Sequence, residues 1–170
     1  MVILFSDRKT KTEKEIIEIL KAYEADYISD KNIHKGGGKL TIISEYKVID
    51  LKIENGIAVF ISETDRFKGQ KLPRGVIGIC EDCNKTALKI LSDSKIPVIT
   101  CGMNSKNTVT LSSINSDTLL ATLQRSFTDK NGKEICPEEF KIKQKKNYHP
   151  FSVMVSIAVL LLNGITPYEL

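Results

Sequence analysis

Two short segments carry residue types that could do chemistry at the ends of predicted strands. The first is Cys80-x-x-Cys83, which lies between an apolar run and a helical pattern. A helix N-terminus lowers the pKa of a thiol, so this placement is typical of redox motifs. Glu81 and Asp82 put negative charge beside both thiols, however, and negative charge disfavours the thiolate. A thiol redox or metal-binding function that uses Cys80 and Cys83 is therefore an alternative prediction.

The second segment, residues 101–108, follows the next predicted strand and is rich in hydrogen-bond donors. Ligands of open α/β sheets usually bind beyond the carboxyl ends of the strands. We predict that the segment binds a small anionic ligand through Cys101, Asn104, Ser105 and Lys106, with Asn104 and Lys106 as the main contacts. A polar turn between two strands is the competing interpretation.

A glycine-rich segment offers a further anion site. Gly36, Gly37, Gly38 and Lys39 could supply exposed backbone amides and a cation, which are the components of an anion-binding nest. The residues after Lys39 have a strand pattern, so no helix dipole would support a phosphate there. A flexible connection is the alternative.

Composition excludes several classes of function. Twenty-five basic and 21 acidic residues among 170 give a net charge of +4, without the clustering expected of a nucleic-acid binder. Lys141, Lys143, Lys145 and Lys146 are typical of a protected sheet edge. The longest apolar run, 153–162, is about half the roughly 20 residues that cross a bilayer. We expect a cytoplasmic protein that has no cofactor or metal site and does not bind membranes.

The N-terminal half begins with a predicted βα unit. Residues 2–6 form a short apolar run typical of a buried strand. Thr12 is a candidate N-cap for the following helix, with Glu15 completing a capping box. The residues expected on the buried face of this helix are Ile16, Ile17, Leu20 and Tyr23. Three strands are then predicted at 39–44, 47–53 and 56–62, with Asn55-Gly56 closing a hairpin between the last two.

The pattern of residues from 75 to the strand after Pro97 predicts a parallel crossover. An apolar strand at 75–80 precedes a helix at 85–94, which Asp82 or Asn84 could cap, and a strand follows Pro97. A polar connection lies between the predicted hairpin and the predicted crossover, and it contains Asp65, Arg66, Phe67 and Gln70. A connection of this length can be functional, although a solvated loop is the usual outcome.

The last part predicts antiparallel strands and a buried helix. Strand patterns cover 108–114, 118–127 and 138–145, with Asn131-Gly132 marking a turn between the latter two. The final helix, 150–163, is apolar on nearly every side and so should lie between layers. The expected fold is a single three-layer α/β domain over 1–170, with a mixed, mainly parallel, Rossmann-like sheet extended by antiparallel hairpins.

The order of elements from about Gly75 to Ile165 resembles the end of the central domain of Mur ligases. Residues 80–84, Cys-Glu-Asp-Cys-Asn, stand at that family's acidic motif, and His149 stands where a helix opens with a His-Asn pair. The resemblance implies ligand contacts from Asp82 and His149. It also implies a nucleotide or a cell-wall precursor as the anionic ligand.

The chain departs from this family where ATP would bind. The phosphate-binding pattern G-x-x-x-x-G-K-[ST] is absent from the sequence, and Pro150 replaces the first asparagine after the histidine. We therefore expect no ATP-dependent ligase activity from this chain alone. A further alternative is an interaction subunit, with a protein partner or a second copy of the chain, that completes a larger enzyme.

Overall fold

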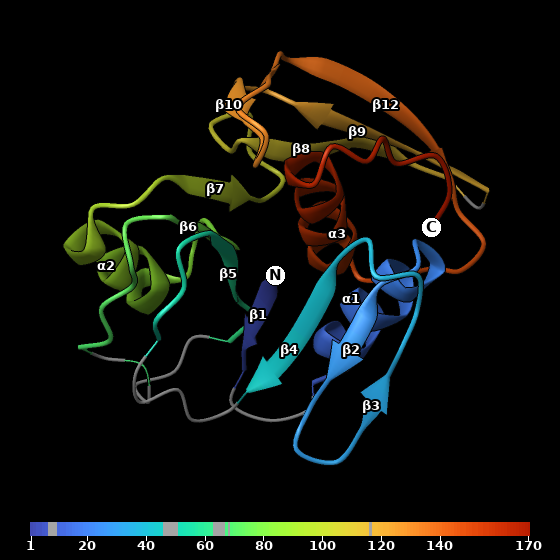
Figure 1. Cartoon of the computed structure of the whole chain (residues 1–170). Helices are drawn as coiled ribbons and strands as arrows, with labels where there is room; N and C mark the ends of the chain where they lie inside the picture. Colours follow the sequence, from blue (N-terminus) through green and yellow to red (C-terminus); the bar gives the residue numbers. More distant parts are fainter. Residues whose placement is uncertain (7–9, 46–50, 63–66, 68, 116) are drawn as a thin grey trace.

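The computed structural model describes residues 1–6, 10–45, 51–62, 67, 69–115 and 117–170, and the statements below refer to these residues. Their helices and strands, in chain order, are β1 (Val2–Phe5), α1 (Lys11–Ala22), β2 (Asp26–Ile28), β3 (Ile33–His34), β4 (Thr41–Glu45), β5 (Gly56–Phe60), β6 (Val76–Glu81), α2 (Lys85–Ser94), β7 (Val98–Cys101), β8 (Val109–Ile114), β9 (Thr118–Leu123), β10 (Phe127–Thr128), β11 (Glu134–Ile135), β12 (Glu138–Lys143) and α3 (Pro150–Leu162). Figure 1 shows their arrangement.

A ten-stranded mixed sheet organises the structure. Its strand order is β12-β9-β8-β7-β6-β5-β1-β4-β2-β3, and β10 pairs with β11 in a separate two-stranded sheet. The seven neighbours from β8 to β2 are parallel, whereas β9, β12 and β3 pair antiparallel to the strands beside them. The predicted α/β fold with a mainly parallel sheet and antiparallel extensions is therefore confirmed.

Helices cover both faces of this sheet. Successive residues of a strand point to opposite faces, and β1 divides its side chains in this way. Val2 and Leu4 pack in the core that includes α1 and α3. Ile3 and Phe5 pack in a second core with α2, where the rings of Phe5 and Phe60 stack with centroids 4.8 Å apart. The molecule thus has three layers, with α1 and α3 on one face of the sheet and α2 on the other.

Helix α3 is enclosed, as its sequence predicts. All its residues from Phe151 to Leu162 are buried. Pro150 occupies the first turn, where its missing N–H costs no intrahelical hydrogen bond. Gly164 follows the last turn with φ of 71°, a backbone conformation that favours glycine. None of the helices in the described part of the chain has the length and apolar character needed to span a membrane.

The predicted N-cap of α1 is wrong by two residues. The pattern Thr-x-x-Glu occurs twice, and the cap is Thr10, whose Oγ1 accepts a hydrogen bond from the N–H of Glu13 at 3.0 Å. The predicted buried face is shifted as well, because Ile19 is buried whereas Ile17 is only half-buried. The carboxylate of Glu15 is turned instead toward α3, to which it is hydrogen-bonded.

The predicted hairpin at Asn55-Gly56 is also wrong. Gly56 begins β5, which pairs in parallel with β1 and β6. Residues 51–53 form no strand, and 47–50 lie outside the described residues. A Cβ on Gly56 would lie 2.5 Å from Cδ1 of Ile53, the end of a half-buried side chain that packs over the start of β5. The turn at Asn131-Gly132 exists, but it joins β10 to β11 instead of closing the β9–β12 pair.

Candidate ligand-binding site

The amino ends of all three helices lie at the carboxyl edge of the parallel strands. Helices α1 and α2 follow β1 and β6 directly. Helix α3 begins beside the first half of α1, where the N–H of His149 donates to Oε2 of Glu15 at 2.9 Å. Its far end, Leu162, lines a cavity with Met1 and Gly56 at the opposite edge. The amino ends of three helices therefore lie at this edge. Glu13 in the first turn of α1 and Glu15 at the start of α3 place negative charge against two of them, whereas α2 has no acidic residue in its first turn.

The loop of residues 102–108 is folded against the end of β6. Nδ2 of Asn107 donates to Oδ2 of Asp82 at 2.7 Å and to the carbonyl oxygen of Asn104 at 3.2 Å. Asn107 is only 2% exposed. A Cβ on Gly102 would lie 2.5 Å from Nδ2 of Asn107, so glycine is required for this close approach. The structure thus brings the predicted residue Asp82 together with the predicted loop.

Three predicted residues of this loop face solvent. Asn104, Ser105 and Lys106 are exposed, and Oδ1 of Asn104 accepts the N–H of Lys106 at 2.9 Å. Within the part of the chain that the structure describes, Lys106 forms no ion pair. The arrangement leaves one cation and several donors available on a loop whose backbone is held from within.

The thiols near this loop have raised pKa values, which disfavours their thiolate forms. Cys80 is buried, and burial, followed by the charges of Asp82, Cys83 and Glu81, raises the pKa of its thiol to about 12. Burial and the adjacent Glu81 also raise the pKa of Cys83. All four cysteines are free. No group of three or more potential metal ligands occurs among the described residues.

Cys101 lies in the core and does not face the loop surface. Its side chain is fully buried in the core that includes α3. Burial raises the pKa of this thiol well above its ordinary value. We therefore leave Cys101 out of the proposed ligand contacts.

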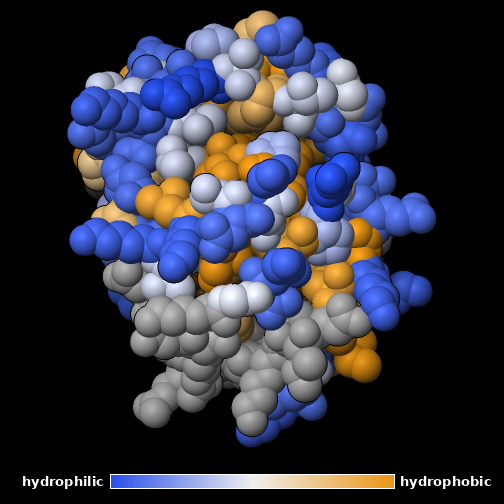
Figure 2. All heavy atoms as spheres, turned by 90° about the vertical axis from the view of Figure 1, so that its left-hand side faces the viewer, coloured by the Kyte–Doolittle hydropathy of each residue, from blue (hydrophilic) through white to orange (hydrophobic). Residues whose placement is uncertain are grey.

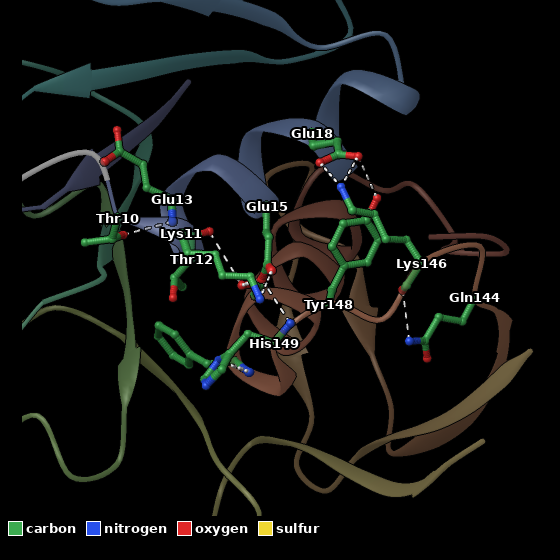
Figure 3. Close-up of polar contacts among 12 residues, drawn as sticks. Thr10, Lys11, Thr12, Glu13, Glu15, Glu18, Gln144, Lys146, Tyr148 and His149 are labelled. Carbon is green, nitrogen blue, oxygen red and sulfur yellow. Dashed lines mark hydrogen bonds and ion pairs between the residues drawn. The ribbon is translucent and has the colours of Figure 1, made fainter. Parts of the chain in front are cut away.

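His149 belongs to the junction between α1 and α3 (Figure 3). It is the N-cap of α3, and its Nδ1 accepts the N–H of Phe151 at 3.3 Å. Oε2 of Glu15 also accepts from the hydroxyl of Ser152 at 2.7 Å. The polar contacts of His149 are therefore with the two helices, and the structure does not bring its side chain together with the Asp82–Asn107 pair.

Glu15 is a buried carboxylate that holds this junction in its ionised form. Burial alone would raise its pKa, but the hydrogen bonds from Ser152 and from the N–H of His149, with the ammonium of Lys11, outweigh burial and lower the pKa. The Nζ of Lys11 lies 3.6 Å from Oε1. The sequence predicted that Glu15 belongs to a capping box with Thr12. The overlapping pair Thr10-x-x-Glu13 could have warned against this, because a helix has only one N-cap.

A second contact joins the segment before α3 to α1. Glu18 accepts from Nζ of Lys146 at 2.9 Å and from the hydroxyl of Tyr148 at 3.2 Å. Burial, followed by the charge and the hydrogen bond of Glu18, raises the pKa of Tyr148 to about 12. Figure 3 shows this group one turn along α1 from Glu15. These contacts hold the segment just before α3 against α1.

Three donors of the glycine-rich segment are engaged within the chain. The N–H of Gly36 donates to Oδ1 of Asp26 at 2.7 Å, and that of Gly37 donates to the carbonyl oxygen of Glu24 at 2.9 Å. Lys39 forms an ion pair with Glu24 at 2.8 Å. Gly38 has a positive φ of 72°. Acidic side chains and a backbone carbonyl thus occupy the N–H groups of Gly36 and Gly37 and the ammonium of Lys39, and we do not propose a site there.

The polar connection after β5 is described only in part. Asp65 and Arg66 lie outside the described residues, whereas Phe67 is buried, with its ring edge-on to Phe5 at 5.1 Å. Gln70 lines a pocket beside α2.

Asn107 was not predicted as a site residue, although it lies within the predicted loop. Nothing in the sequence pattern shows which asparagine side chain of the loop turns inward.

Comparison with known proteins gives a similarity of fold. No protein-family model matches the sequence, and no curated protein sequence matches it. A solved structure, UDP-N-acetylmuramate:L-alanyl-gamma-D-glutamyl-meso-diaminopimelate ligase (MPL) from Neisseria meningitides, is similar with a TM-score of 0.55 and 10% identity. The match covers 97% of this chain and 61% of that chain. The chain therefore has a fold distantly similar to that of a Mur ligase.

Proposed function

We propose that this chain is a Mur-ligase-like domain that binds a small anionic ligand, a nucleotide or a cell-wall precursor, without ATP-dependent ligase activity. The observation that carries the proposal is the hydrogen bond from Asn107 to Asp82, which holds the 102–108 loop beside the start of α2. The loop presents Lys106 to solvent at the carboxyl edge. This edge is where open α/β sheets usually bind ligands.

Positive charge beside the loop comes from Lys106 and from the amino end of α2, which has no acidic residue in its first turn. Glu81 and Asp82 oppose it with negative charge just before α2. The carboxylate of Asp82 is engaged by the amide of Asn107. We assign Lys106 and Asn104 as ligand contacts, with Ser105 as a further donor. Asp82 and Asn107 are positioning residues, because they act by holding the loop.

The connection between β1 and α1 supports the absence of ligase activity. Residues 6–10, Ser-Asp-Arg-Lys-Thr, join Phe5 to Lys11 and contain no glycine. A phosphate-binding loop needs glycines there so that backbone amides can approach the phosphates, and its pattern spans about eight residues. The groups that would position ATP for amide ligation are therefore not supplied by this connection.

The binding proposal is tested by thermal unfolding of the purified chain with ATP, UDP and UDP-N-acetylglucosamine as probes. A ligand at about 100 times its dissociation constant adds roughly 2.7 kcal/mol to stability. We expect a shift with at least one probe, reduced in Lys106→Ala and retained in Lys106→Arg. Lys31→Ala is the matched control, since Lys31 is an exposed lysine on a distant loop.

Two results would contradict this function. If no probe shifts the transition, or if Lys106→Ala and Lys31→Ala respond alike, the loop is not an anion site. Co-purification of a stoichiometric protein partner with a chain that binds none of the probes would favour the interaction subunit instead. Release of inorganic phosphate from ATP in the presence of UDP-N-acetylmuramate and an amino acid would overturn the absence of ligase activity.

A further inference from the structure

A second pocket lies on the outer side of α2. Its volume is about 350 Å³. The residues that line it are Gly69, Gln70, Lys71, Lys85, Thr86, Lys89, Ile90 and Asp93. It shares no residue with the 102–108 loop, so it is separate from the site proposed above. Small-molecule pockets usually have volumes of about 300 to 1,000 Å³.

The wall of the pocket opposite α2 is held at both ends. Phe67, which is 2% exposed, anchors one end in the aromatic cluster with Phe5 and Phe60. At the other end, Leu72 is buried and its N–H donates to Oγ of Ser94 at 3.0 Å. Residues 69–71 therefore run beside α2 between two fixed points, and the pocket is a built feature of the fold.

Lysines dominate the charge of this pocket. Lys85 and Lys89 are one helical turn apart and so lie on one side of α2, while Lys71 comes from the opposite wall. Within the described ranges none of the three forms an ion pair. Asp93 is the one carboxylate among the described lining residues, whose charges therefore sum to an excess of two positive charges.

The accessible apolar surface of the pocket comes mainly from the aliphatic stems of its lysines, because Ile90 is 3% exposed and packs in the core beneath α2. The face of the molecule that carries α2 shows apolar surface between long hydrophilic side chains (Figure 2). Aliphatic walls with a cationic rim fit a ligand that has an apolar body and a charged group at its edge.

We infer that this pocket binds a small molecule with an apolar or aromatic body and a doubly negative group, of the chemical class of aryl phosphates. The body would lie against the aliphatic stems of the lysines, and the charged group would lie between Lys71 on one wall and Lys85 and Lys89 on α2. Thr86 and Gln70 supply neutral hydrogen-bonding groups beside it. Lysines bind phosphates as point charges, and burial of the ring adds hydrophobic stabilisation.

The test uses 1-naphthyl phosphate as probe, with 1-naphthol and inorganic phosphate as matched halves. Binding is followed by amide chemical shifts of the isotope-labelled full chain at about 0.15 M salt, where exposed charges are screened beyond about 8 Å. We expect saturable shifts at Gln70, Thr86 and Lys89, with each half binding about tenfold or more weakly than the whole probe.

Variants separate this pocket from the 102–108 loop. Lys85→Ala/Lys89→Ala should weaken the probe about tenfold or more, while Lys106→Ala and Lys31→Ala should leave the affinity read from the amide shifts of Gln70, Thr86 and Lys89 unchanged. Because these lysines are exposed, the fold should persist, and the amide spectrum of each variant reports that directly. Unchanged affinity in the double variant, or shifts confined to residues outside the pocket, would overturn the inference.

Discussion

The two faces of the sheet differ in how completely their helices enclose them. On one face, α3 is buried along its whole length from Phe151, and Glu15 joins it to α1 through hydrogen bonds to His149 and Ser152. On the other face, α2 buries Ala87, Ile90 and Leu91 and turns its lysines to solvent. The closed face at α3 is held by packing and buried polar contacts, whereas the open face at α2 has an exposed helix side. The contrast is between these two helices, because α1, beside α3, also lines a cavity of about 370 Å³.

This difference separates stability from binding within one fold. A fully buried helix contributes apolar area but offers no accessible side chain, so α3 should respond to truncation in its unfolding free energy. A helix with one exposed side can change its surface charges at little cost in stability. The predictions below test whether the two faces divide in this way.

The largest effect is expected from truncating the closed face. Leu160 is 0% exposed, and Leu160→Ala should lower the free energy of unfolding by about 2 to 5 kcal/mol, through lost burial and the cavity left behind. Leu88→Ala on α2 is the matched control, because Leu88 is only half-buried and should lose less. Urea denaturation measures both. Equal losses at the two positions would remove the proposed difference between the faces.

The next largest loss of unfolding free energy is expected where α2 packs on the sheet. A Cβ on Gly78 would lie 2.2 Å from Cδ2 of Leu91, so Gly78→Ala should destabilise the chain by about 1 to 3 kcal/mol through overpacking. Adding Leu91→Ala should recover part of the loss caused by Gly78→Ala, because it removes the clashing atoms. A double-mutant cycle from chemical denaturation gives the coupling. If the two losses simply add, this contact does not set the spacing between α2 and β6.

A smaller effect, dependent on pH, is expected from Glu15. Its pKa is lower in the folded chain than its ordinary value of 4.5, so ionised Glu15 stabilises the fold above that pH. The contribution is lost as the pH falls through the lowered pKa. Glu15→Gln keeps an acceptor but cannot ionise, so its stability should fall less than that of the wild type between pH 6 and pH 3. Parallel curves for the two proteins would show that the charge of Glu15 does not strengthen the junction.

The smallest effect on stability is expected on the open face. Lys85→Ala and Lys89→Ala should each change the free energy of unfolding by no more than about 0.5 kcal/mol, because neither lysine forms an ion pair with a described residue. Thermal unfolding without ligand measures this. A loss above about 1 kcal/mol from either change would mean that the lysine stems support α2, which would weaken the contrast with α3.

The sequence predicted best the elements that have strong local patterns. The β6–α2–β7 unit and α3 have long periodic or apolar runs, and their observed bounds lie within a residue or two of the predicted ones. Strands β2 and β3 were missed because they have three and two residues, too few for a pattern. The hairpin at Asn55-Gly56 was predicted from local turn chemistry, but the pairing of β5 with β1 and β6 is decided by distant segments.

The candidate sites show the same limit. The 102–108 loop could be found because a polar stretch follows an apolar strand, yet the turn of Asn107 toward Asp82 depends on residues 25 positions apart. The lysine pocket could not be predicted, since its walls come from residues 69–71 and from α2. The glycine-rich segment shows the reverse case, in which an attractive pattern has its donors used by Glu24 and Asp26.

The hydrogen bond from Ser152 to Glu15 joins residues 137 positions apart, and this has a consequence for the order of folding during synthesis. Helix α2 and its flanking strands are close in sequence, so they can form while the rest of the chain is still being made. The face of the sheet that α3 covers stays open to water until the ribosome has released residues 149–162. In that interval the strands display apolar side chains that can recruit chaperones or other nascent chains.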